Sequence, residues 1–217
     1  HIAFIMDGNN RWSDKNNYSL FEAYKIGANK LFKLSNYLFN KKNINSVSAF
    51  AFSVNNQKRS KKVISIINKL LSFYLSDILK NKNFNFRIKF FGDISYFSQK
   101  HQDQIYLLEK RNNKSNNTLN IFLNYGGQEE IVDMLNFFRG SKRSITKKHL
   151  DNYFNDRYNA PELLVRTGGF KRISNFILYQ LSFTELVFIN KLWPDFTISD
   201  LNKIISKYKS IERKFGG

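Results

Sequence analysis

Asp7-Gly8-Asn9-Asn10-Arg11 brings a carboxylate, a glycine and an arginine close together, directly after an apolar run. A carboxylate is a ligand for a hard cation such as Mg²⁺, and an arginine forks onto phosphate oxygens. A glycine lets backbone N–H groups approach an anion. Asp-Gly-Asn is also a common turn sequence, and the segment alone favours a turn without chemistry.

A second group of this kind consists of Arg166-Thr-Gly-Gly169 followed by Arg172 and Ser174. Two arginines with glycines and a hydroxyl donor could hold a diphosphate. The alternative is a solvated helix start with Ser174 as its cap. Because these residues also follow an apolar run, we favour the diphosphate. Further polar residues in such positions are Ser53, Asn56 and Arg59, Gly92-Asp93, and Asn124-Tyr-Gly-Gly127.

The elements that must position these side chains are six apolar runs of strand length, several of them nearly continuous, as in strands covered on both faces. Helical periodicity separates them, most clearly over residues 63–79 and again over 131–138 and 201–211. This order predicts an α/β domain with a mostly parallel sheet, whose ligands bind beyond the carboxyl ends of the strands. The runs are residues 2–7, 47–53, 86–93, 119–125, 163–167 and 185–190.

The composition restricts the class of protein. The 217 residues contain no linker or repeat, so we expect a single domain over residues 1–217. The absence of cysteine excludes disulfides and thiolate metal sites, and the three histidines are scattered. No apolar run approaches the roughly 18 residues of a membrane span. We therefore expect a soluble cytoplasmic protein, with a peripheral position at a membrane left open, or an organelle if a targeting segment was removed before His1.

The net charge of +18 favours anionic partners, although a composition rich in Lys, Asn, Ile and Phe explains part of it. Motifs for a P-loop, a dinucleotide fold, a hydrolase elbow and a zincin are absent. A basic nucleic-acid-binding domain is a remote alternative. Because the aromatic residues lie mostly in core-patterned runs, we do not expect nucleic acid as a partner.

The motifs together resemble the cis-prenyltransferases of the undecaprenyl diphosphate synthase type over essentially the full chain. The matching segments, in the order in which the family has them, are HIAFIMDGNNRW at 1–12, AFSVNNQKR at 51–59, FFGDISYF at 90–97, LNIFLNYGG at 119–127, LLVRTGGFKRISNFILYQLSFTELVF at 163–188, LWPDF at 192–196 and ERKFGG at 212–217.

The resemblance implies a homodimer of six-stranded, mostly parallel sheets surrounded by helices, each with a hydrophobic tunnel. It also implies a Mg²⁺-dependent transferase in isoprenoid biosynthesis. The reaction condenses isopentenyl diphosphate with an allylic diphosphate such as farnesyl diphosphate, and each new double bond is cis. The product would be a polyprenyl diphosphate, the kind of lipid carrier used in cell wall synthesis.

The resemblance also assigns roles to residues. Asp7 and Asn56 would be catalytic, and Asp7 would share Mg²⁺ with Glu185. Residues 63–79 and 119–125 would line the tunnel, with Phe122 affecting its depth. Lys214 and Gly216 resemble a C-terminal Arg-x-Gly that reaches the partner subunit's site. The substrate-binding residues would be Gly8, Asn9, Asn10, Arg11, Trp12, Ser53, Arg59, Arg166, Arg172, Ile173 and Ser174, although core packing is an equally good interpretation of Trp12.

The chain departs from the family pattern at several positions. Leu20 and Tyr24 replace an arginine and a histidine that contact the allylic diphosphate, each contact being worth about 1.5 to 3 kcal/mol. Phe170 replaces a glutamate beside the isopentenyl site, which we expect to impair the enzyme. Such losses leave a non-catalytic or partner-dependent subunit as an alternative function. The remaining departures are Asn10 for a glycine and Val54-Asn55 for Ser-Glu.

Overall fold

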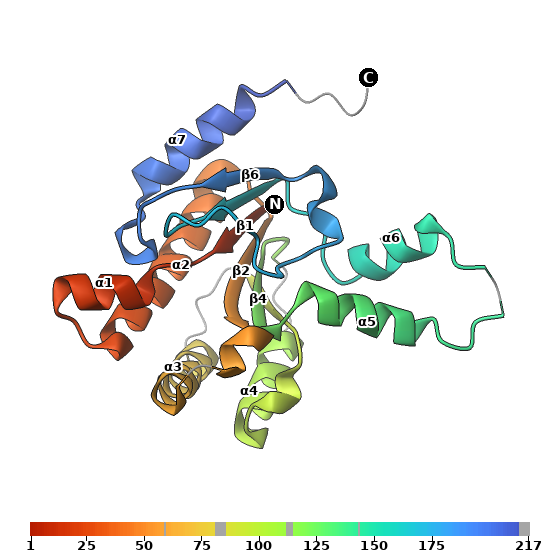
Figure 1. The fold of residues 1–217 in the computed structure, drawn as a ribbon, viewed down its shortest axis with the longest axis horizontal. Coiled ribbons are helices and arrows are strands. Elements are labelled where there is room, and N and C mark those ends of the chain that lie inside the picture. Colours follow the sequence, from red (N-terminus) through yellow and green to blue (C-terminus); the bar gives the residue numbers. More distant parts are fainter. Residues whose placement is uncertain (59, 81–85, 112–114, 143, 213–217) are drawn as a thin grey trace.

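A six-stranded sheet forms the centre of the computed structural model, which describes residues 1–58, 60–80, 86–111, 115–142 and 144–212 (Figure 1). All neighbouring strands run parallel, in the order β3-β4-β2-β1-β5-β6. Each predicted run overlaps one strand, which confirms the predicted α/β class. The strands are β1 (Ile2–Ile5), β2 (Ser46–Ser53), β3 (Arg87–Phe91), β4 (Thr118–Tyr125), β5 (Leu163–Arg166) and β6 (Glu185–Phe188).

The sheet extends from β1 in two directions. Ile5 aligns with Phe50 of β2 on one side and with Arg166 of β5 on the other. The carboxyl ends of these three strands therefore meet at one edge. In open α/β sheets a ligand crevice lies beyond the carboxyl ends, at the point where the strand order reverses.

Helices connect the strands, as the periodicity predicted. The patterns over 63–79, 131–138 and 201–211 correspond to α3, α5 and α7. The helices are α1 (Asn9–Asn16), α2 (Leu20–Lys42), α3 (Lys61–Lys80), α4 (Gln99–Lys110), α5 (Gly127–Phe137), α6 (Lys147–Asn155) and α7 (Ile198–Lys209), with short 3₁₀ helices η1 (Val54–Lys58), η2 (Ile94–Tyr96), η3 (Gln180–Phe183) and η4 (Trp193–Asp195).

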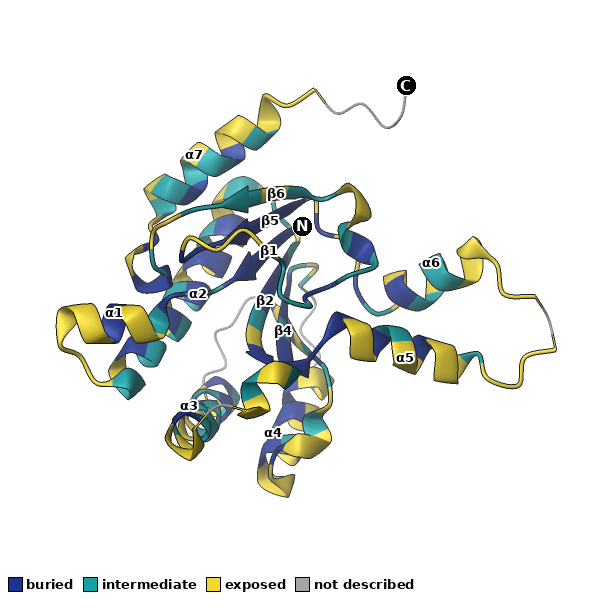
Figure 2. Ribbon diagram, in the orientation of Figure 1, coloured by how far each residue is buried: buried dark blue, intermediate teal, exposed yellow. Residues whose placement is uncertain are grey.

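The larger core lies where α2, α3, α4 and α7 cover one face of the sheet. Leu38 of α2, Leu75 of α3, Ile105 of α4 and Leu201 of α7 are buried there against β-strand residues such as Phe4. Figure 2 shows the strands of the sheet as mostly buried and the outer sides of these helices as exposed. This face therefore excludes water from most of the sheet.

The opposite face carries a smaller aromatic core. Phe122 packs there against Phe91 and Phe176, with ring centroids 5.1 and 5.0 Å apart. Its neighbours Ile121 and Leu123 point to the first face, because side chains alternate along a strand. The expectation that Phe122 affects tunnel depth is therefore wrong.

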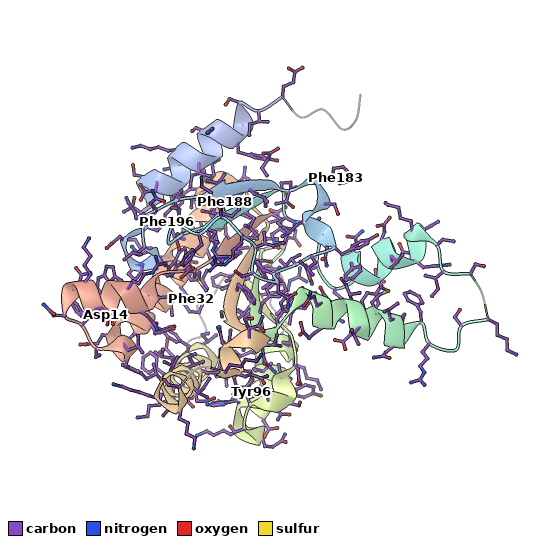
Figure 3. The ribbon with its side chains drawn as sticks, viewed as in Figure 1. Asp14, Phe32, Tyr96, Phe183, Phe188 and Phe196 are labelled. Atoms are coloured by element: carbon purple, nitrogen blue, oxygen red, sulfur yellow. The ribbon has the colours of Figure 1, made fainter. Side chains whose placement is uncertain are left out.

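The helices α5 and α6 project away from the sheet (Figure 1). Their base is fixed by Glu130, which is buried and accepts hydrogen bonds at Oε2 from Tyr125 (2.6 Å) and Tyr158 (2.8 Å). Phe183 of η3 lies on the surface with 74% of its area exposed (Figure 3). None of the helices in the described part of the chain combines the length and the apolar character needed to cross a membrane.

Candidate active site

A cavity of about 850 Å³ begins at the carboxyl ends of β1, β2 and β5 and continues between the sheet and helices α2 and α3. Its mouth is lined by charged and polar residues and its interior by apolar ones. Phe32 of α2, labelled in Figure 3, lines this cavity together with Tyr74 of α3, and the centroids of their two rings lie 5.8 Å apart. The apolar lining comes from α3 and β4, as predicted, and from β3: Ile67, Leu70, Leu71, Leu75, Ile78, Ile88, Phe90, Ile121 and Leu123.

Asp7 follows β1 at the mouth of the cavity and contributes the only carboxylate to its described lining. The Nη2 atom of Arg166 lies 2.8 Å from Oδ2 of Asp7, and Nη2 of Arg11 lies 3.3 Å from Oδ1. The Asp7 carbonyl accepts hydrogen bonds from Oγ1 of Thr167 (2.7 Å) and from the Trp193 amide (3.1 Å). These backbone bonds fix the carboxylate between two guanidinium groups.

Arg166 ends β5 and has a side chain that is only 4% exposed. Its Nη1 atom donates to Oγ of Ser174 (2.6 Å) and to the Arg172 carbonyl. Ser174 has a left-handed backbone conformation, with φ of 53°, and belongs to a turn. The alternative of a helix start capped by Ser174 is therefore wrong, because residues 171–179 form no helix.

Gly8 is the N-cap residue of α1 and allows the chain to turn from β1 into that helix. Its φ of +114° favours glycine, and a Cβ atom there would lie 2.8 Å from Cδ2 of Leu192. The first N–H groups of a helix have no partner within the helix, and they attract anions. The amides of residues 9–11 therefore border the cavity together with Arg11.

Ser53 ends β2, and Asn56 follows it in η1. The Ser53 amide donates to Oδ1 of Asn56 (3.4 Å), and the Asn55 amide donates to Oγ of Ser53 (3.2 Å). All three residues line the cavity. Arg59, the other residue predicted here, lies outside the described residues, as do Lys214 and Gly216 of the C-terminal motif.

Comparison with known proteins identifies the family. The model of the family described as "Putative undecaprenyl diphosphate synthase" matches residues 5–216. An isoprenyl transferase from Fusobacterium nucleatum is 37% identical, over all of this chain and 95% of its own length. The chain belongs to the undecaprenyl diphosphate synthase family of prenyltransferases. This membership confirms the resemblance found in the sequence.

Other relatives of known name or structure support the same family. A (2E,6E)-farnesyl-diphosphate-specific ditrans,polycis-undecaprenyl-diphosphate synthase from Buchnera aphidicola is 35% identical, over all of this chain and 91% of its own length. The structure of lavandulyl diphosphate synthase from Lavandula x intermedia, in complex with dimethylallyl diphosphate, has a TM-score of 0.89 and 27% identity, covering 100% and 98% of the two chains. A probable undecaprenyl diphosphate synthase from Campylobacter jejuni has a TM-score of 0.83 and 31% identity, with the same coverage.

Most of the described residues that the family pattern selects line the cavity, but Trp12, Ile173 and Glu185 do not. Trp12 is buried, its Nε1 donates to Oδ1 of Asp195 (2.7 Å), and its ring packs on Tyr18. Ile173 packs against the smaller core instead of lining the cavity. For these two residues the structure favours packing over substrate binding.

Glu185 lies at the wrong end of the sheet to share a metal with Asp7 in the same chain. It begins β6 and aligns with Leu163 of β5, which in turn aligns with Ile2. Asp7 lies five residues beyond Ile2, so the two carboxylates are separated by roughly 16 Å along the strands. Within one chain, the structure therefore does not bring Glu185 to the Mg²⁺ site predicted at Asp7.

The departures from the family pattern differ in their consequences. Tyr24 lines the cavity, but Leu20 does not. Asn10 lies in the first turn of α1 without a positive φ, so its side chain fits without backbone strain. Phe170 lies at the mouth of the cavity, and the guanidinium groups of three arginines surround its ring.

Sequence reasoning missed Asn175, which lines the cavity and fixes the turn that carries Ser174. Its Oδ1 accepts from the Gln128 amide (2.9 Å), and its Nδ2 donates to Oε2 of Glu129 (3.0 Å). Its carbonyl accepts from the Gly127 amide (2.8 Å). The signal in the sequence was an asparagine, the residue after glycine that best tolerates its φ of 65°.

The described residues contain no cluster of three or more histidine, cysteine or acidic side chains that could hold a metal ion by themselves. Mg²⁺ is usually bound through one or two carboxylates together with substrate phosphates. Asp7, 28% exposed at the mouth of the cavity, is suited to that arrangement. The residues therefore fit a cation that arrives with a diphosphate, and they do not fit a permanent metal centre.

Proposed function

We propose that this protein is a cis-prenyltransferase that condenses isopentenyl diphosphate with an allylic diphosphate, such as farnesyl diphosphate, into a polyprenyl diphosphate. The observation that carries the proposal is that one cavity joins a cationic mouth to an apolar interior. The name of the Buchnera relative supports farnesyl diphosphate as the primer, and the dimethylallyl diphosphate complex supports an allylic diphosphate at such a site. The proposed catalytic domain is the whole of residues 1–217.

The allylic diphosphate would lie at the start of α1. The amides of residues 9–11 and the guanidinium of Arg11 would donate to its oxygens. When the bond from the allylic carbon to oxygen breaks, the diphosphate leaves with the electron pair, and these preformed donors stabilise the charge that develops. Asp7 would hold Mg²⁺, which would supply further positive charge to the leaving diphosphate.

The isopentenyl diphosphate would bind between Arg166, Arg172 and Ser174. Arg166 is already aimed at this place by its hydrogen bonds to Ser174 and to the Arg172 carbonyl. With both substrates bound, the double bond of isopentenyl diphosphate supplies the electrons for the new carbon–carbon bond. The other carbon of that double bond becomes positively charged, and loss of one proton from the CH₂ group next to it balances the reaction. We place Asn56 near that proton.

The interior of the cavity would hold the growing hydrocarbon. The described side chains of α3, β3 and β4 that line the cavity carry no charge, so burial of each isoprene unit is favourable. Among the described lining residues, Ile78 lies near the end of α3 and Ile88 near the amino end of β3, on the side of the cavity away from the mouth. This end would limit the length of the product.

We also propose a homodimer and contact with a membrane surface. Val132, Leu135 and Phe137 of α5 are more than half exposed, and Leu186 of the edge strand β6 is 43% exposed. Apolar side chains on a projecting helix are typical of a protein interface. A hydrocarbon product and a net charge of +18 both favour an anionic bilayer as its destination. Light scattering and vesicle sedimentation would test the two proposals.

The deciding experiment incubates the purified chain with Mg²⁺, farnesyl diphosphate and labelled isopentenyl diphosphate, and extracts the lipid products. We expect labelled polyprenyl products that an Asp7→Ala control does not form. A chain that is inactive alone but active with a second subunit would be the partner-dependent alternative. Inactivity under all these conditions, together with salt-sensitive binding of oligonucleotides, would instead support the nucleic-acid-binding alternative.

A further inference from the structure

The ring of Phe170 is the point at which three arginines of the cavity mouth meet. The guanidinium carbon lies 4.1 Å from the ring centroid for Arg172, 5.0 Å for Arg11 and 5.6 Å for Arg166. All three distances are within the roughly 6 Å over which a cation is attracted to the face of an aromatic ring. One uncharged side chain therefore contacts the cations assigned to both diphosphates.

The backbone before Phe170 is shaped to bring the ring there. Gly168 and Gly169 have φ of +85° and +83°, a conformation that favours glycine. Their amides donate to the carbonyls of Lys191 and Ile189, both at 2.9 Å. A Cβ atom at Gly168 would lie 2.6 Å from Nη2 of Arg11. The turn thus allows close approach of Arg11.

The positive charge at the mouth of the cavity is stabilised by a group that attracts cations. Three guanidinium groups repel one another, and Asp7 is the only carboxylate among the described lining residues. The negative face of an aromatic ring attracts a guanidinium and accepts no conventional hydrogen bond from it, so the N–H donors of the arginine are not used up. A carboxylate at this position would instead form ion pairs with those donors and compete with a diphosphate.

We propose that Phe170 is a positioning residue that holds Arg11 and Arg172 at the mouth without occupying any of the N–H donors that a diphosphate needs, in place of the family's glutamate. This role rests on the proposed function of the cavity and reverses the expectation that Phe170 impairs the enzyme. Because one ring contacts arginines of both diphosphate positions, it affects the binding of both substrates.

The test compares Phe170→Leu, which keeps an apolar side chain but removes the ring, with Phe170→Tyr, which keeps the ring. Phe73→Leu is the matched control, because Phe73 is similarly exposed (45% against 41%), has Lys25 at 5.0 Å from its ring, and does not line the cavity. The Kd of inorganic diphosphate in EDTA reports binding without turnover. KM for each substrate and kcat report the reaction.

We expect Phe170→Leu to raise the Kd of inorganic diphosphate and both KM values by about fivefold, the effect of losing one to two exposed cation–π contacts. The fall in kcat should be smaller than the rise in KM. Phe170→Tyr should keep the Kd and KM values of the wild type. Phe170→Glu should weaken diphosphate binding more than Phe170→Leu does. Phe73→Leu should match the wild type.

Equal Kd values for Phe170→Leu, Phe73→Leu and the wild type would overturn the role of Phe170. So would tighter diphosphate binding by Phe170→Glu. If the wild type formed no prenyl product, the proposed function would fail, whereas the Kd comparison would still decide whether Phe170 positions the arginines.

Discussion

Arg166 donates a hydrogen bond from Nη2 to Oδ2 of Asp7 across 2.8 Å, and its own side chain is almost completely buried. A diphosphate at the mouth would need the same guanidinium, and a metal ion would need the same carboxylate. The two residues therefore pair with each other until a diphosphate binds Arg166 and a metal ion binds Asp7. Removing the charge of Asp7 should therefore have opposite effects on the binding of diphosphate without metal and on turnover.

Replacing Asp7 by asparagine should separate these two effects. Asp7→Asn removes the negative charge that competes for Arg166 and Arg11, so the Kd of inorganic diphosphate in EDTA should fall. The same variant should lose turnover by about 100-fold or more, because the metal site at the leaving diphosphate is lost. Calorimetric titration in EDTA and a steady-state assay with Mg²⁺ measure the two quantities.

Asp14→Asn is the matched control, because Asp14 lies on the exposed side of the same helix and does not line the cavity. It should change neither quantity. Weaker binding of diphosphate by Asp7→Asn would contradict the competition between the carboxylate and the substrate.

The length of the product should depend on the side of β4 that is changed. Ile121→Phe places a larger side chain in the apolar part of the cavity. The cavity becomes smaller, so the longest polyprenyl product should be shorter. Phe122→Leu changes the adjacent residue on the opposite face, so it should lower stability without changing product length. Chromatography of the extracted lipids checks both variants, and equal lengths in wild type and Ile121→Phe would contradict the proposed tunnel.

Trp12 should prove to be a structural residue. Trp12→Phe keeps a ring against Tyr18 and removes the hydrogen bond to Asp195, which should lower the free energy of unfolding by about 1 to 2 kcal/mol. KM for both substrates should stay within about twofold of the wild type. A large rise in KM with unchanged stability would instead restore Trp12 as a substrate contact.

Glu130 should make stability depend on pH. Burial raises the pKa of Glu130 above its ordinary value of 4.5, although hydrogen bonds from Tyr125 and Tyr158 act in the opposite direction. The folded state therefore retains a proton that the unfolded state loses, so this residue's contribution falls as pH rises from about 4.5 through the raised folded pKa. Glu130→Gln lacks that dependence.

Urea unfolding of wild type and Glu130→Gln between pH 4 and pH 7 measures the effect, with Glu129→Gln as a nearby control outside this buried cluster. The stability of Glu130→Gln relative to the wild type should increase with pH. A difference that is constant or decreases with pH would show that the hydrogen bonds outweigh burial.

The sequence predicted the strands and the mouth of the cavity because both depend on local patterns. Each apolar run became a strand, and Asp7 and Arg166 are close because parallel strands bring their carboxyl ends to one edge. Register could not be predicted in this way. The resemblance assigned Glu185 to the metal, although Glu185 starts its strand and Asp7 follows the end of another.

The surroundings of individual side chains could not be predicted from the sequence either. Trp12 and Phe170 are both aromatic residues within matched motifs, yet one is buried against Asp195 and the other lies among three arginines. The difference comes from tertiary contacts with residues far along the chain. For Asn175 the sequence offers only the residue type, and its role in fixing the turn comes from hydrogen bonds such as the one from the Gln128 amide.

The most direct measurement of prenyl transfer is the ratio of inorganic diphosphate released to labelled isoprene units incorporated. With Mg²⁺, farnesyl diphosphate and isopentenyl diphosphate, we expect release of one diphosphate for each unit incorporated, and we expect Asp7→Ala to lose both release and incorporation. Release of diphosphate without incorporation would indicate hydrolysis and would contradict the proposed condensation, as would incorporation that Asp7→Ala leaves unchanged.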